Sequence, residues 1–143
     1  AIGRNSMTSN TSGALNTAIG DGTLLANTTG VNNVAIGQSA LAANLSGNNC
    51  IAIGHAALDA GTNVGENIAI GTSSVSSITS GTFNIGIGTS SLTANTSGAQ
   101  NIAIGLQSMD GSTTCNNNVA VGFQSLSGTS TVGHLYWKSK YVG

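Results

Sequence analysis

Side chains able to act as nucleophiles, acids, bases or metal ligands are few in this sequence and widely separated. They are Cys50, His55, Cys115, His134 and the acids Asp21, Asp59, Glu66 and Asp110. Catalysis needs a nucleophile, a base and an orienting group within hydrogen-bond reach, and this inventory assembles no such cluster. We therefore expect no enzyme, no catalytic residue, no cofactor and no metal site, and we interpret the charged residues as solvated surface groups.

One glycine-rich segment, Gly86-Ile87-Gly88, is similar to the start of a nucleotide-binding turn. The third glycine of such a turn is missing at Ser91, and an internal repeat accounts for the other two. We assign no cofactor to this segment.

The composition departs from that of an ordinary globular domain. Charged residues make up 5% and aromatic residues 3% of the 143 residues, with 21 Gly and no Pro, whereas about a quarter of a typical domain is charged. Ile, Val, Leu and Ala are nevertheless abundant, which favours an ordered chain. A net charge of −1 gives no electrostatic footprint for nucleic acid. Gly, Asn and Ser interrupt every apolar run before the roughly 18 residues of a membrane span, so we expect no membrane insertion by this segment.

The chain repeats with a period of 17 residues, and this repeat organises everything else. The tripeptide Ala/Gly, Ile/Val, Gly ends at Gly3, Gly20, Gly37, Gly54, Gly71, Gly88, Gly105 and Gly122. Four positions after each glycine stands Met7, Leu24, Leu41, Leu58, Val75, Leu92, Met109 or Leu126. Because the spacing never slips, each repeat is one coil of a stack.

Each coil contains a short segment with apolar residues at alternate positions, as in Ile68 and Ile70. Alternation in β-branched residues predicts a strand with both side chains on one face, and we expect that face to be the core. With the Leu column, this gives three inward columns. The fold class is therefore all-β, a parallel β-roll or β-solenoid of about eight 17-residue coils over residues 1–131. Residues 132–143 are a cap, a neck or the start of a further coil.

The remainder of each coil has the composition of a turn. Asn-x-Ser/Thr-Gly segments begin at Asn10, Asn27, Asn44 and Asn95. We expect Asn and Ser to bond their own backbone and Gly to adopt positive φ there, although the triplets also match glycosylation acceptors. A second Asn column, at Asn16, Asn33, Asn67, Asn84, Asn101 and Asn118, predicts a side-chain ladder between coils.

A column of threonines offers an alternative function. It comprises Thr11, Thr28, Thr62, Thr79, Thr96 and Thr113, interrupted by Leu45 and Ser130. Regularly spaced Thr methyls and hydroxyls on a flat solenoid would suit an ice-binding surface, although a turn also selects Thr. Thermal hysteresis separates an ice-binding protein from a structural one.

The two cysteines lie about four coils apart, or roughly 18 Å along the stack. This separation exceeds the span of a disulfide, so we expect Cys50 and Cys115 to remain unpaired.

Small residues occupy the middle of each predicted strand, and we expect them to point out of the roll. They are Ala18, Ala35, Ala52, Ala69, Gly86, Ala103 and Ala120. A water-facing position would not be restricted to Ala and Gly, so we interpret this column as a trimer interface where another backbone approaches closely. The thin core of a single roll also favours oligomerisation.

The coil motif, Asn-Ile-Ala-Ile-Gly followed by a small residue and Leu, resembles the head repeats of trimeric autotransporter adhesins. It is also similar to repeats of bacteriophage and giant-virus fibre proteins. The adhesin repeats are shorter than the 17-residue repeat of this chain, which agrees better with the viral fibre type. The resemblance covers residues 1 to about 126. It implies a homotrimer of left-handed parallel β-rolls, located outside the cell on a cell surface or a virion.

These observations together predict a structural segment of a trimeric extracellular fibre or adhesin, a rigid spacer that also contacts a host-surface glycan or protein. An ice-binding solenoid is the second hypothesis, and a polysaccharide lyase built on a β-helix is the third. Because the chain starts within a strand at Ala1-Ile2-Gly3, we expect it to be a window from a longer array.

The C-terminal residues break the composition of the repeats. They include Tyr136, Trp137, Lys138, Lys140 and Tyr141. Aromatic rings flanked by Lys are candidates for stacking on a surface glycan, and the alternative is a cap over the open end of the core.

Overall fold

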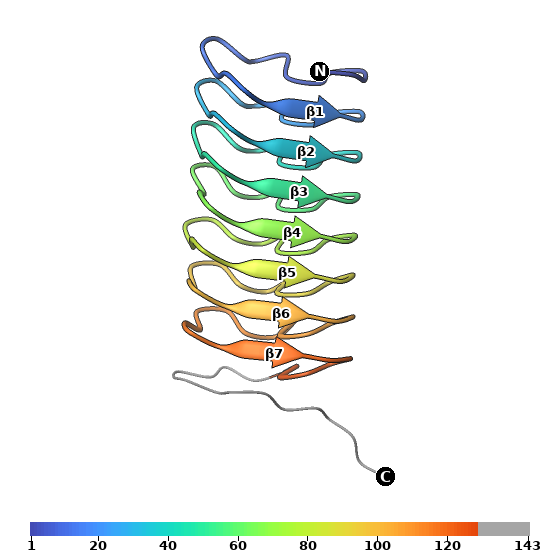
Figure 1. The fold of residues 1–143 in the computed structure, drawn as a ribbon, viewed down its shortest axis with the longest axis vertical. Coiled ribbons are helices and arrows are strands. Elements are labelled where there is room, and N and C mark those ends of the chain that lie inside the picture. The colour runs from blue at the N-terminus through green and yellow to red at the C-terminus, as the bar shows by residue number, and fades with distance from the viewer. Residues whose placement is uncertain (129–143) are drawn as a thin grey trace.

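The computed structural model describes residues 1–128, which form a rod of stacked coils (Figure 1). The strands are β1 (Thr17–Ile19), β2 (Val34–Ile36), β3 (Ile51–Ile53), β4 (Ile68–Ile70), β5 (Ile85–Ile87), β6 (Ile102–Ile104) and β7 (Val119–Val121). They form one seven-stranded parallel sheet in chain order, and an isolated parallel bridge joins Ile2 to Ile19. The predicted all-β solenoid is confirmed, with seven strands where we expected about eight coils.

The register between neighbouring strands is 17 residues throughout, as in the pairing of Val34 with Ile51. At the start of β2 the Val34 amide donates to the Cys50 carbonyl of the next coil at 2.8 Å. Beyond its end the Gly37 amide donates to the Ile19 carbonyl of the preceding coil, also at 2.8 Å. Similar bonds recur outside the strands, where Leu41 donates to Ala57 at 3.0 Å. Hydrogen bonds therefore join the coils on more than one side of the rod.

The coils close through backbone conformations that most residues avoid. Three columns of non-glycine residues adopt positive φ, represented in one coil by Ser39 (58°), Leu41 (52°) and Asn49 (60°). Each such residue costs about 1–2 kcal/mol relative to ordinary backbone. This cost accumulates because the same three columns recur along the rod. The hydrogen bonds between coils must offset it.

The strand side chains face the opposite way from our expectation. The small central residues Ala35, Ala52 and Ala69 are fully buried inside the roll, whereas the flanking Ile residues lie on its outer face and are partly exposed. Our prediction that Ile fills the core and Ala points outward was therefore wrong. The alternation was correct, but its phase was reversed.

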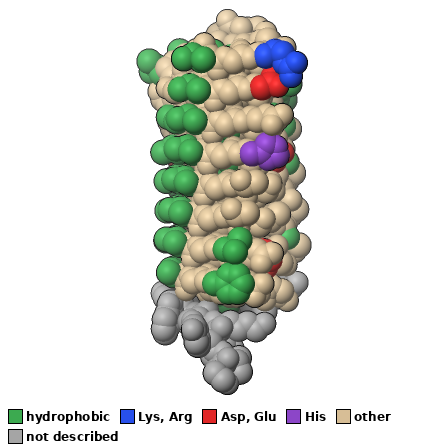
Figure 2. Space-filling view, turned by 90° about the vertical axis from the view of Figure 1, so that its right-hand side faces the viewer, with side chains coloured by type: hydrophobic (Ala, Val, Ile, Leu, Met, Phe, Trp, Pro, Cys, Tyr) green, Lys and Arg blue, Asp and Glu red, His purple; other side chains and the backbone are tan. Residues whose placement is uncertain are grey.

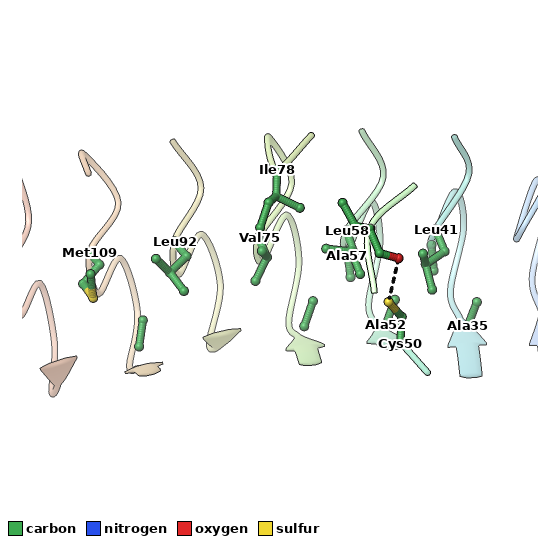
Figure 3. Close-up of a cluster of buried hydrophobic side chains, with 14 of the residues drawn as sticks. Ala35, Leu41, Cys50, Ala52, Ala57, Leu58, Val75, Ile78, Leu92 and Met109 are labelled. Atoms are coloured by element: carbon green, nitrogen blue, oxygen red, sulfur yellow. Dashed lines mark hydrogen bonds between the residues drawn. The ribbon is translucent and has the colours of Figure 1, made fainter. Parts of the chain in front are cut away.

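The interior is too narrow for large side chains on both walls. Figure 3 shows Leu41, Leu58, Val75, Leu92 and Met109 in successive coils, with Ala35 and Ala52 pointing toward this column from the strands. At Gly86 even a Cβ atom would lie 2.5 Å from the Val75 Cγ2 atom and 2.7 Å from the Ser74 Oγ atom. The Leu column therefore leaves room for only Ala or Gly beneath the strand.

The predicted Asn ladder lies inside the roll and satisfies buried backbone groups. Asn84 donates from Nδ2 to the Gly98 carbonyl at 2.8 Å, and its Oδ1 atom accepts the Asn101 amide at 3.1 Å. Neighbouring side chains are linked as well, because Asn84 Nδ2 donates to Asn67 Oδ1 at 3.1 Å. A buried backbone amide without an acceptor is costly, which explains why this column is Asn in every described coil except the one with Cys50.

The turn column of asparagines is also interior. Asn44 accepts the Gly47 amide at 3.0 Å and donates to the Gly47 carbonyl at 3.0 Å, as expected for a side chain that bonds its own turn. Our expectation of positive φ at Gly47 was wrong. Glycine is needed there because a Cβ atom would overlap the Val64 carbonyl of the next coil and the Asn44 side chain.

Two interior positions three residues apart have compensating sizes. The pair is Asn27 with Gly30, Asn44 with Gly47, Gly61 with Val64, Ile78 with Gly81, Asn95 with Gly98 and Ser112 with Cys115. A Cβ atom on Gly61 would lie 2.5 Å from Val64 Cγ2. A large residue at one position therefore requires a small one at the other.

This compensation predicts the outcome of a double-mutant cycle. Gly61→Asn alone should destabilise the rod by about 1–3 kcal/mol because the new side chain overlaps Val64. Adding Val64→Gly recreates the pair found at Asn44 and Gly47 and should recover that loss. Thermal melting followed by circular dichroism measures both variants. A double variant that is less stable than Gly61→Asn would contradict the volume argument.

The interior ladder yields a second stability prediction. Asn84→Ala removes the acceptor of a buried backbone amide and should cost about 1–3 kcal/mol. Asn116 is the matched control, because its Oδ1 atom accepts the Ala99 amide at 2.8 Å at an exposed position. Water can replace the exposed acceptor, so Asn116→Ala should change the free energy of unfolding by less than about 0.5 kcal/mol. Denaturant unfolding measures the free energy of unfolding of both variants. Equal losses would contradict the argument that burial of the amide sets the cost of losing its acceptor.

Candidate functional site

The most prominent surface feature is the outer face of the sheet, which we call the isoleucine face. Its two columns consist of Val34, Ile51, Ile68, Ile85, Ile102 and Val119, and of Ile19, Ile36, Ile53, Ile70, Ile87, Ile104 and Val121. Exposed fractions of 39% at Ile19, 37% at Ile104 and 39% at Val121 are high for large apolar side chains. These columns contain no charged residue.

The register makes this face continuous. Ile53 pairs with Ile70 and Ile70 with Ile87, so every side chain lies beside its equivalent in the next coil. Figure 2 shows the result as an unbroken ridge of hydrophobic side chains along the rod, with the charged side chains of that view placed away from it. Six steps of about 4.8 Å give a stripe about 29 Å long. A continuous apolar surface of this kind is a candidate interaction site.

The column that we predicted as the trimer interface does not reach the surface. Ala18, Ala35, Ala52, Ala69, Gly86, Ala103 and Ala120 are all buried within their own chain. A neighbouring chain cannot contact them in this structure, and their small size is explained by the opposite wall of the same roll. That interface assignment is therefore corrected.

The charged residues do not assemble a reaction centre within residues 1–128. Arg4 donates to the Asp21 carboxylate at 2.8 Å, and this hydrogen bond lowers the pKa of Asp21 and raises the pKa of Arg4. Both groups are solvent-accessible, so their interaction is a surface ion pair of small energetic value. Burial raises the pKa of the Asp59 carboxyl group. Within the described part of the chain, no three His, Cys, Asp or Glu side chains come close enough to bind a metal ion.

The cysteines are unpaired and buried, as predicted from their separation. Cys50 takes an Asn position of the interior ladder and donates from Sγ to the Val64 carbonyl at 3.4 Å, the dashed bond in Figure 3. Burial raises the pKa of both thiols. Cys50 therefore replaces a polar ladder residue, whereas Cys115 occupies the column of Gly81 and Gly98. Both buried thiols are poor nucleophiles.

The Asn-x-Ser/Thr triplets and the Thr column serve the fold. Asn27, Asn44 and Asn95 are fully buried, which supports the structural interpretation over glycosylation of the folded chain. The hydroxyl groups of Thr28 and Thr79 donate to carbonyls of the next coil, at 2.9 and 3.0 Å. Turn stability accordingly accounts for these Thr residues.

The other predicted contact residues lie outside the described part of the chain. They are the candidate glycan contacts Tyr136, Trp137, Lys138, Lys140 and Tyr141. The isolated His134 lies outside it as well. Among residues 1–128 no helix is both long and apolar enough to cross a membrane. Comparison with family models, curated proteins and solved structures finds no match for this chain.

The buried thiols give a testable prediction. Cys50 and Cys115 are 0% and 2% exposed, so a thiol reagent should react with the native protein at a rate set by unfolding. Denaturation should release both thiols at once, as measured by spectrophotometric titration. Fast reaction in the native state, or recovery of a bridge between Cys50 and Cys115, would contradict the stacked structure.

Proposed function

We propose that this chain is a structural segment of a homotrimeric extracellular fibre or adhesin, in which it acts as a rigid spacer. The observation that carries the proposal is the isoleucine face, an uncharged apolar stripe that runs the length of a narrow rod. Leaving such a stripe in water forfeits about 25 cal/mol for each Å² of apolar surface. A partner that covers it would recover that free energy.

A second and third copy of the same chain are the occupants that fit this face best. All copies have the same 17-residue register, so parallel rods at equal height align coil by coil along the whole stripe. The two columns are distinct, which allows the Ile68 column of one rod to pack on the Ile70 column of the next in a closed ring. Three rods enclose such a central apolar seam, and their exposed turns remain outside.

The resemblance of the coil motif to adhesin heads and viral fibre repeats supports the extracellular location, on a cell surface or a virion. It also supports contact with a host-surface glycan or protein. We do not propose ice binding, because the Thr28 and Thr79 hydroxyl groups act as hydrogen-bond donors between coils.

The assembly is tested by changing the isoleucine face. The parent protein should sediment as a trimer in analytical ultracentrifugation, and Ile70→Asp should sediment as a monomer because a charge enters the apolar seam. Thr72→Asp places the same charge two residues away at an exposed position outside the seam, and it should remain trimeric.

A milder variant protects this test against misfolding. Thr17 occupies the Ile68 column naturally in β1, so Ile68→Thr should fold and weaken the trimer without abolishing the coil. Far-UV circular dichroism confirms folding of each variant. A monomeric parent protein would refute the proposal, and so would an Ile70→Asp variant that remains trimeric.

A further inference from the structure

A polar hollow interrupts the regular surface between the third and fifth strands, on the turn side of the coils. It has a volume of about 270 Å³ and is lined by Ser46, Asn48, Asn49, Asn63, Glu66 and Thr82, together with glycine backbone. It opens where Gly65 lacks the side chain that Asn48 and Thr82 supply in the same column. Among the described residues, the Gln100 amide donates to the Thr82 carbonyl at 3.0 Å, but no such bond joins Phe83 to Gly65.

The side chains around the hollow leave hydrogen-bond donors unused. Asn48 Oδ1 accepts the Val31 amide at 2.7 Å, and Asn63 Oδ1 accepts the Ser46 hydroxyl at 2.8 Å. These bonds fix both amide groups with their oxygen atoms engaged within the coil stack. Their nitrogen atoms are therefore left to donate toward a ligand, and Asn49 behaves in the same way because its Oδ1 accepts from Asn32 at 3.3 Å.

The hollow also contains an acceptor. The Glu66 carboxylate is exposed and forms no ion pair or side-chain hydrogen bond with any residue of the described part. A carboxylate accepts only, and it binds two neighbouring hydroxyl groups in a bidentate manner. Three amide donors and one carboxylate acceptor in a single hollow match the donor and acceptor pattern of vicinal hydroxyl groups.

The side chain of Phe83 lies in the coil next to that of Glu66. Phe83 follows Glu66 by one 17-residue step in the same outward column, so the coil spacing places their Cα atoms about 4.8 Å apart. It is 55% exposed and has a φ of 59°, a conformation that Asn32, Asn49 and Asn117 take more easily in this column. A large apolar side chain that is mostly exposed at a strained backbone position points to a functional role.

We propose that this hollow binds one neutral sugar unit of a surface glycan. The apolar face of a pyranose ring packs on Phe83, while its hydroxyl groups bind Glu66 and the amide groups of Asn48, Asn49 and Asn63. The volume lies just below the usual range for drug-sized ligands, which suits a single unit of a longer chain. The negative charge of Glu66 selects against uronic and sialic acids, since two carboxylates in one hollow repel each other. The site uses residues outside the isoleucine face, so it stands or fails independently of trimer formation.

The experiment titrates ¹⁵N-labelled protein with methyl β-galactoside and methyl β-glucoside while amide chemical shifts are recorded. Saturable shifts should be confined to the coils around Gly65 and Phe83. Phe83→Ala should weaken binding about tenfold, and Phe123→Ala, which removes another exposed ring in a different column, should leave it unchanged. Phe83→Leu provides a second variant that keeps most of the apolar volume and should show intermediate affinity.

Charge selectivity gives the sharpest outcome. Methyl β-glucuronide should not bind the parent protein, and Glu66→Gln should weaken the neutral glycosides about tenfold while admitting the glucuronide. The proposal is overturned if neither neutral glycoside produces saturable shifts. It is equally overturned if the parent protein binds the glucuronide as well as the neutral sugars, or if both Phe83→Ala and Glu66→Gln bind like the parent.

Discussion

The structure depends on one constraint, which is that every position stacks on its equivalent 17 residues away. Most backbone hydrogen bonds of each coil are made to the coils above and below, so a coil has little stability by itself. This arrangement explains how residues such as Leu41 tolerate positive φ. Their cost is set against bonds that form only when the neighbouring coil repeats the same geometry.

The same constraint limits the contents of the interior. Opposite each strand there is room for one side chain of the Leu column, such as Leu58, which faces Ala69. The rest of the interior is mostly Asn, with Val64 and Ile78 taking positions of the turn column pair. The apolar residues that do not fit, such as Ile68 and Ile70, are placed on the outer face of the strand. A narrow core and an apolar surface are therefore two results of one geometry. The polar interior adds specificity, since each Asn must meet its partners in both neighbouring coils.

Much of the fold could be predicted from the sequence because the period is unbroken. The strands, the parallel register, the Asn ladder between coils and the separation of Cys50 from Cys115 all follow from spacing. The phase of the strands does not, because Ile-Ala-Ile alternation fits a roll with either face inward. The width left opposite the Leu column decides between the two, and that width is set by residues distant in sequence. Gly47 was misjudged for the same reason, since its restriction comes from the next coil.

The candidate sites were less accessible to sequence analysis. The isoleucine residues were recognised but assigned to the core. The polar hollow arises from a single coil in which Gly61, Val64 and Gly65 depart from the consensus. In the sequence these residues only make this coil match the repeat less well, and they give no sign of a binding site. Phe83 was a signal available beforehand, because it is the one aromatic residue in a column that is otherwise polar apart from Leu15.

The unbroken register also determines how such a rod can vary in length. Duplication or loss of one whole coil keeps every column aligned and alters the reach of the rod by about 4.8 Å. An insertion of any other size that enters the stacked positions moves Asn84 and its equivalents out of their ladder and buries polar groups without partners. The rod can therefore become longer or shorter only by whole coils. Tandem duplication of one coil is then the simplest evolutionary route to a spacer of a new length.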